Sequence, residues 1–205
     1  MVKSKKASGR YPLLLYRRTM DRVWVLALLL GLLLIAVAGW ALVNETMIFG
    51  VSSNIWLFAA AIVALVLSVF AFMARFVAYL QVFSNYLSVV TPFLRLKISF
   101  RRVRSVYPTL IQQLFPPQGS SWSQRSFLEP FYGKTAVVVE LIDYPINPAL
   151  LRLFLPAQMF SPQLPGLVFL VPDWLKLSTE LDSFYGAWLQ AQGGRTKPGA
   201  GRRRG

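Results

Sequence analysis

The chain has 205 residues, of which 22 are lysine or arginine and 8 are aspartate or glutamate, so its formal net charge is +14. Hydrophobic residues make up 55% of the sequence and the mean hydropathy is +0.50, which argues against an ordinary water-soluble globule and indicates a membrane protein. There is no cysteine and no histidine. These absences exclude disulfides, thiolate metal sites, cysteine nucleophiles and catalytic triads that contain histidine.

The first long uncharged segment predicts a membrane-spanning helix over 23–43. No residue from Val23 to Asn44 is charged, and the apolar core has the length of about 20 residues that a helix needs to cross a bilayer. Ala36-Val37-Ala38 also resembles the cleavage site of a secretory signal peptide. The apolar run exceeds the about 7–15 residues of such a signal, so the span is the favoured interpretation.

A second uncharged segment, from Thr46 to Ala74, predicts a second span over 54–76. Arg75 follows it and can extend to the lipid phosphates. Apolar residues continue beyond Arg75, so we expect this helix to project toward Phe83. Residues 23–83 would then form a transmembrane hairpin.

Basic residues flank the hairpin and are missing from the segment 45–54 between its spans. By the positive-inside rule, both termini lie in the cytoplasm and the connecting loop lies outside. We therefore expect a multi-pass protein of the plasma membrane, with a basic cytoplasmic N-terminus over 1–22. The basic residues are Lys3, Lys5, Lys6, Arg10, Arg17, Arg18 and Arg22 before the first span, and Arg75, Arg95, Lys97, Arg101, Arg102 and Arg104 after the second.

Small residues at spacings near one helical turn predict that the two spans pack closely against each other. A homo-oligomer interface through the same faces is the alternative. The residues are Ala27, Gly31 and Gly39 in the first span and Ala60, Ala64 and Ser68 in the second.

Residues 84–192 have many prolines and interleaved polar residues, and they are long enough to form a cytoplasmic domain with its own core. Strands are predicted over 86–91 and 94–100, the second with an apolar and a basic face, and then over 134–142, 151–155 and 167–171. A short helix is expected over 108–114. A C-terminal helix begins after the N-cap Asp173 and ends at Gly193-Gly194. An antiparallel sheet closed by one helix results.

This order, together with the segment YLSVVTPFLRLKISFRRVRSV over 86–106, resembles the bacterial pleckstrin-homology-like (PH-like) domains that are attached to membrane hairpins. The resemblance implies a seven-stranded antiparallel barrel or sandwich capped by a C-terminal α-helix. It also implies roles in binding and assembly more often than in catalysis. The expected fold class is thus an α+β membrane protein with a two-helix hairpin and a PH-like domain.

Five basic residues are expected to face anionic lipid just inside the membrane: Arg95, Lys97, Arg101, Arg102 and Arg104. Specific binding of an inositol phosphate headgroup by three of them, as the resemblance to eukaryotic PH domains suggests, is the sharper alternative. The tail 193–205 is expected to be disordered, with a basic cluster at Arg202, Arg203 and Arg204 that could touch lipid phosphates. Nucleic acid is not an expected partner.

No residue pattern supports catalysis, so no enzyme, metal or cofactor is predicted. Glu140 and Asp143 are the nearest carboxylates to each other in a strand region, but their spacing would direct them to opposite faces. Ser126 and Lys134 could form a dyad, without a supporting motif. We expect a membrane-anchored binding or scaffolding protein. The alternative is an accessory subunit of a larger membrane complex, with a protein partner or a second copy bound through the helices.

Overall fold

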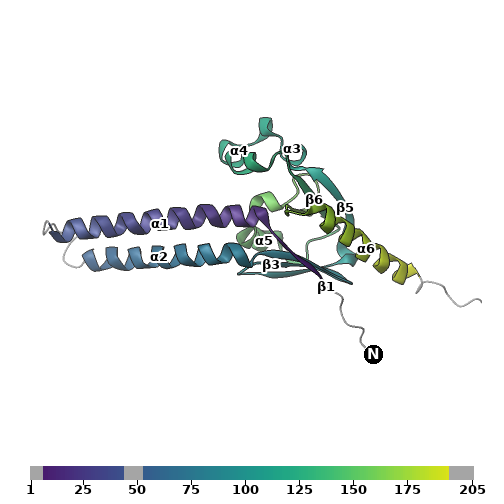
Figure 1. Cartoon of the computed structure of the whole chain (residues 1–205), viewed down its shortest axis with the longest axis horizontal. Coiled ribbons are helices and arrows are strands. Elements are labelled where there is room, and N and C mark those ends of the chain that lie inside the picture. Colours follow the sequence, from purple (N-terminus) through teal and green to yellow (C-terminus); the bar gives the residue numbers. More distant parts are fainter. Residues whose placement is uncertain (1–6, 44–52, 194–205) are drawn as a thin grey trace, which may run out of the picture. The chain divides into compact units, whose positions relative to one another are not determined.

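The computed structural model describes residues 7–43 and 53–193 (Figure 1). These residues form two compact units. The helix unit comprises the described residues between Tyr16 and Ala78, and the sheet unit comprises 7–15 and 79–193. The fold is mixed α+β, with two long apolar helices and two antiparallel sheets.

The helix unit is a pair of helices that run side by side, α1 (Leu14–Val43) and α2 (Ser53–Val77), as Figure 1 shows. Each contains a segment of mean hydropathy 2.7 that is long and apolar enough to cross a membrane. Leu26, Leu33, Ile62 and Val69 are among the many apolar side chains that are more than half exposed. The pair therefore presents an apolar outer surface.

Sheet A has the strand order β1 (Ala7–Pro12), β2 (Tyr79–Phe83), β3 (Tyr86–Val90) and β4 (Arg95–Ser99), and each strand is antiparallel to its neighbour. β1 precedes α1 in the chain and β2 follows α2. The two strands pair directly, with Pro12 opposite Tyr79. Both apolar helices thus lie within the connection between two neighbouring strands.

Sheet B consists of β5 (Val103–Leu110), β6 (Thr135–Leu141) and β7 (Gly166–Phe169), in that order and antiparallel. The connection from β5 to β6 contains α3 (Ile111–Leu114) and α4 (Trp122–Leu128). The connection from β6 to β7 contains α5 (Pro148–Phe154). The long connections of the sheet unit therefore carry its short helices.

The last helix, α6 (Trp174–Gly193), packs on the strands and begins where predicted. A side-chain oxygen of Asp173 accepts a hydrogen bond from the backbone nitrogen of Lys176 at 3.1 Å, which confirms the N-cap. Leu177 and Leu181 of α6 are 0% and 1% exposed. Tyr185 donates a hydrogen bond to the carbonyl oxygen of Val103 at 3.3 Å, which ties α6 to sheet B.

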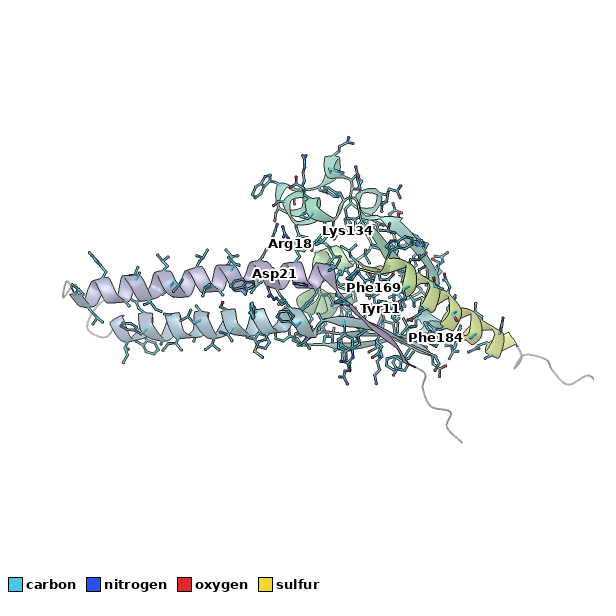
Figure 2. The ribbon with its side chains drawn as sticks, viewed as in Figure 1. Tyr11, Arg18, Asp21, Lys134, Phe169 and Phe184 are labelled. Atoms are coloured by element: carbon cyan, nitrogen blue, oxygen red, sulfur yellow. The ribbon has the colours of Figure 1, made fainter. Side chains whose placement is uncertain are left out.

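The core of the sheet unit takes side chains from both sheets and from the segment that enters α1. Tyr11 of β1 and Phe169 of β7 are 5% and 0% exposed (Figure 2). Leu13 and Leu15 are 2% and 1% exposed, and the backbone nitrogen of Leu14 donates to the carbonyl oxygen of Leu170 at 2.9 Å. Tyr11, Leu13 and Leu15, from the segment that enters α1, are therefore part of this core.

Several predicted elements are confirmed: strands β3, β4, β6 and β7 correspond to the strands predicted over 86–91, 94–100, 134–142 and 167–171. The prediction of a strand over 151–155 is wrong, because α5 covers most of this segment. Pro148 suits the first turn of a helix, and the side chain of Asn147 caps this turn by accepting a hydrogen bond from the backbone nitrogen of Ala149 at 3.0 Å. These two residues favour a helix at this position.

The predicted domain boundaries also need correction. The segment 79–83 was expected to continue the second helix, but it is strand β2 with Leu80 and Val82 fully buried. The segment 7–12 was expected in a separate N-terminal region, but it is strand β1. Both strands are only five or six residues long, so their alternation of buried and exposed residues is a weak signal. The long apolar runs of the neighbouring helices give a stronger helix signal, and for this reason neither strand was predicted.

Candidate functional site

Arg95 and Lys97 lie on the outward face of β4, an edge strand of sheet A. Both side chains are exposed, whereas Leu96 and Ile98 are 1% and 0% exposed, which confirms the predicted alternation. The Lys97 ammonium group lies 5.8 Å from the centre of the Tyr86 ring on β3. β4 therefore presents two cations on one face.

The other three predicted basic residues lie where the chain passes from sheet A to sheet B. Arg101 and Arg102 are in a 3-10 turn after β4, and Arg104 is on β5; all three are exposed. Nη1 of Arg102 donates a hydrogen bond to the carbonyl oxygen of Tyr144 at 3.1 Å. These five residues, which we call the basic surface, thus come from two strands of different sheets and the turn between them.

The register of the strands shows at which end of sheet A Arg95 lies. Pro12 is opposite Tyr79, Tyr79 is opposite Val90, and Val90 is opposite Arg95. This row contains the last residue of β1 and the first residue of β2. Arg95 is therefore at the end of the sheet where the chain leaves for α1 and returns from α2, and the 3-10 turn follows the opposite end of β4.

β1 contributes a further cation, Arg10, to this sheet. In the sequence, Arg10 served only as one of the basic residues that predict the membrane orientation. Arg10 is opposite Gln81, Gln81 is opposite Ser88, and Ser88 is opposite Lys97. Directly opposite residues point to the same face of a sheet. Arg10 is exposed, and its guanidinium carbon lies 4.9 Å from the centre of the Tyr79 ring. Arg10 was missed because β1 itself was missed.

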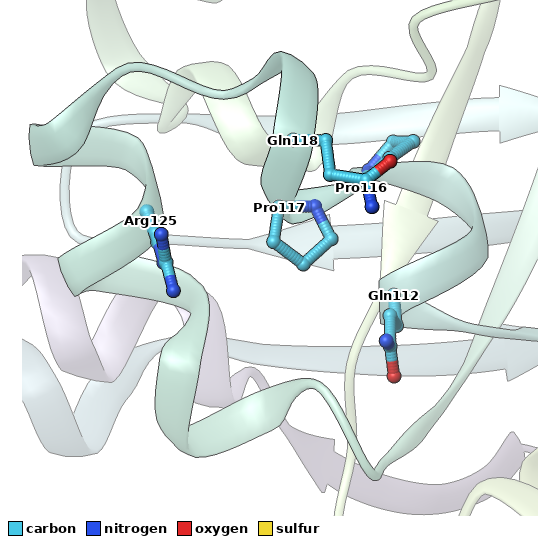
Figure 3. A pocket seen from close by; sticks show the side chains of 5 residues that line it. All are labelled: Gln112, Pro116, Pro117, Gln118 and Arg125. Atoms are coloured by element: carbon cyan, nitrogen blue, oxygen red, sulfur yellow. The ribbon is translucent and has the colours of Figure 1, made fainter.

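Two open hollows of the sheet unit contain arginine side chains. One, of about 480 Å³, is lined by Arg102 and residues 143–148. The other, of about 430 Å³, is lined by Gln112, Pro116, Pro117, Gln118 and Arg125 (Figure 3). Among the residues described there, Arg125 is the one with a charge. Both hollows are open to solvent.

Gly31, Ala64 and Ser68 lie in the contact between α1 and α2. A Cβ atom on Gly31 would be 2.9 Å from Cδ2 of Leu65, so this glycine allows the helices to approach closely. Ala64 and Ser68 are 6% and 4% exposed. The Ser68 hydroxyl donates a hydrogen bond to the carbonyl oxygen of Trp24 at 2.9 Å.

The packing prediction is wrong for Ala60 and Gly39, while Ala27 is half-buried. Ala60 is exposed, and no atom lies within 4 Å of a Cβ placed on Gly39. Alanine occupies both 60 and 61, and one residue turns a helix by about 100°. Ala61, which is 0% exposed, therefore takes the packed position.

An ion pair that the sequence pattern did not indicate joins the two helices. Nη1 of Arg75 is 3.0 Å from Oδ1 of Asp21. The Arg75 guanidinium carbon also lies 4.1 Å from the centre of the Phe72 ring and 4.6 Å from that of Phe76. The first 44 residues contain no other carboxylate than Asp21, which was the signal available in the sequence.

Glu140 belongs to a hydrogen-bonded group of sheet B. Its carboxylate accepts hydrogen bonds from the hydroxyls of Ser105, at 2.5 Å, and Tyr107, at 3.0 Å. Burial raises the pKa of Tyr107, and the hydrogen bond and negative charge of Glu140 raise this pKa further. Both oxygens of Glu140 thus serve contacts with β5.

The remaining candidates for chemistry have other surroundings. Asp143 lines the hollow that contains Arg102. The ammonium group of Lys134, which is labelled in Figure 2, lies 5.5 Å from the centre of the Phe131 ring. Within 7–43 and 53–193, no group of three or more acidic side chains could hold a metal ion. Arg202, Arg203 and Arg204 lie outside the described residues.

Comparisons with protein-family models, with curated proteins and with solved structures found no match.

Proposed function

We propose that this chain is a membrane-anchored binding or scaffolding protein, with a PH-like cytoplasmic domain whose basic surface lies against anionic lipid. The observation that carries the proposal is the position of Arg95. This residue shares a row with Pro12 and Tyr79, the strand ends that adjoin the apolar helices. A cation at that end of sheet A is well suited to meet lipid phosphates.

The apolar outer surface of the helix pair supports membrane anchorage, because side chains such as Leu26 and Ile62, 66% and 61% exposed, are costly in water. The pairing of β1 with β2 supports a hairpin whose two ends emerge on one side of the bilayer. The excess of lysine and arginine at these ends favours the cytoplasmic side.

Two features support a PH-like domain. The described part of the chain has seven strands in sheets of four and three. A C-terminal helix, α6, packs on strands of both sheets. The number of strands and the C-terminal helix agree with what the resemblance implies. The hairpin differs from the expectation, because it lies between β1 and β2 and not before the domain.

Fluorescence of the full chain in vesicles tests the role of the basic surface. The sequence has no cysteine, so Ser99→Cys, at an exposed position of β4, provides one thiol for an environment-sensitive fluorophore. Each basic residue near an anionic surface contributes about 1 kcal/mol, and salt screens this attraction. We expect a blue shift in vesicles that contain phosphatidylglycerol, reversed by high salt.

Matched variants make this test specific. Replacing all five residues of the basic surface by glutamine should abolish the blue shift. A control with glutamine at Arg125, Lys134 and Lys176, which lie outside this surface, should retain most of it. Equal emission in neutral and anionic vesicles would contradict the role in lipid binding.

The alternative function, an accessory subunit of a larger membrane complex, is favoured by the exposed insertion between β5 and β6. Trp122, at the start of α4, is 85% exposed. Exposed tryptophans are common anchors of protein interfaces. A photo-crosslinker at Trp122 would capture one defined membrane protein in cells if this alternative holds, and only lipid or nothing if it does not.

A further inference from the structure

One end of the sheet unit carries an exposed apolar cluster that the basic surface does not include. Phe93 in the β3–β4 turn is 55% exposed, and Leu150 and Leu153 of α5 are 53% and 74% exposed. The rings of Phe93 and Phe154 have their centres 6.4 Å apart, so the turn and α5 are neighbours in the fold (Figure 1). We call Phe93, Leu150 and Leu153 the apolar end cluster.

The position of this cluster along sheet A follows from the register. The row of Pro12, Tyr79, Val90 and Arg95 is the last row before the β3–β4 turn. The turn is closed by a hydrogen bond from the Thr91 nitrogen to the Leu94 carbonyl oxygen at 2.8 Å. Phe93 therefore extends beyond the strand ends that adjoin the apolar helices.

Cations accompany the apolar end cluster. Arg95 and Arg152 are both exposed, one on the first residue of β4 and the other on α5 between Leu150 and Leu153. Apolar side chains flanked by arginine are typical of surfaces that lie in the headgroup layer of a bilayer. On α5, Leu151 instead points into the core and is 1% exposed, so the helix is amphipathic.

We infer that the apolar end cluster inserts into the headgroup layer of the same bilayer that the helices cross, as a second contact that does not depend on charge. This inference rests on the proposed membrane anchorage. The lipid headgroup layer would cover the apolar area that these three side chains otherwise expose to water.

Quenching by spin-labelled lipids tests the inference on the full chain in vesicles. Ala149→Cys places a fluorophore on the exposed side of α5 and leaves all three apolar residues in place. Lipids with a nitroxide near the headgroup should quench it. Quenching should persist at 1 M salt, where the screening length is about 3 Å and electrostatic contacts are weak.

Two controls accompany this measurement. A fluorophore at Ser183→Cys, exposed on α6, should remain unquenched. Replacing Phe93, Leu150 and Leu153 by glutamine should abolish quenching at Ala149→Cys. The variant loses the ring contact of Phe93 with Phe154, so a small drop in its thermal midpoint in detergent is expected, but it should keep a cooperative transition because all three side chains are more than half exposed.

The outcomes separate the inference from the function on which it rests. If the chain resists extraction by alkaline carbonate but Ala149→Cys is not quenched at high salt, the inference is wrong and membrane anchorage stands. Extraction by carbonate would overturn both. Quenching that survives in the triple glutamine variant would also overturn the role of the cluster.

Discussion

Gly31 shows how one residue sets the distance between the two apolar helices. Its missing side chain leaves room for Leu65, whose Cδ2 atom would lie 2.9 Å from a Cβ at this position. Gly39 belongs to the same helix but has open space around it. The two glycines therefore differ in what they contribute to packing.

We predict that Gly31→Leu destabilises the helix pair by about 1–3 kcal/mol, because a new side chain would overpack this contact. Gly39→Leu is the matched control and should change the stability little. The free energy of unfolding in detergent, measured by steric trapping, checks both. Similar losses for the two variants would contradict the packing shown by the structure.

Tyr107 makes the stability of sheet B depend on pH. Its pKa is raised, so the folded state favours the neutral phenol. The corresponding stabilisation is complete below the ordinary tyrosine pKa of about 10 and is lost as the pH rises through the raised value. We predict that Tyr107→Phe loses less stability than the parent between pH 9 and pH 11, about the range of this titration. Thermal midpoints measured across this range check the prediction; parallel curves would refute it.

At the scale of elements, short segments are where sequence patterns are weakest. The apolar pattern of the segment 151–155 is compatible with a strand and with a helix. The N-cap Asn147 and the following Pro148 favour the helix, α5. The alternation over 94–100 was unambiguous because each exposed residue, Arg95, Lys97 and Ser99, is polar. A strand is easy to predict when one of its faces is apolar and the other is polar.

Gly166 limits how β6 and β7 can pair. A Cβ atom there would lie 2.9 Å from the carbonyl oxygen of Val139, a backbone atom that cannot move without disturbing β6. We predict that Gly166→Ala destabilises the sheet unit by about 1–3 kcal/mol. Gly186→Ala in α6, where the space is open, should stabilise it by about 0.5–1 kcal/mol. Chemical denaturation of the full chain in detergent measures both changes.

At the scale of the whole molecule, the helices interrupt a domain instead of preceding it. β1 lies before them and β2 after them, yet the two strands are neighbours in sheet A. Opposite residues of an antiparallel pair have Cα atoms about 4.5–5.5 Å apart. Pro12 and Tyr79 are such a pair, and Leu15 is only three residues after Pro12, so a short linker can connect Leu15 to Tyr79.

We predict that replacing residues 16–78 by a short glycine-serine linker yields a folded, water-soluble sheet unit. It keeps β1, which pairs with β2, and the buried side chains of Tyr11, Leu13 and Leu15. The fragment 84–205 is the control and should not fold, because it lacks β1 and β2. Circular dichroism and a cooperative thermal transition distinguish the two; a well-folded fragment 84–205 would contradict the fold described.

The sequence by itself determined the two apolar helices, four of the seven strands seen in the described residues, and the C-terminal helix with its Asp173 cap. These features depend on periodicity, length and capping, which are properties of neighbouring residues. The basic face of β4 was predictable for the same reason.

Only the tertiary structure decided which segments meet. The pairing of β1 with β2, the choice of Ala61 over Ala60, and the contact of Asp21 with Arg75 across 54 residues all depend on distant parts of the chain. The apolar end cluster likewise exists because the fold brings the β3–β4 turn to α5. Local hydrophobic patterns specify that a segment packs, but the partner is selected by the free energy of the whole fold.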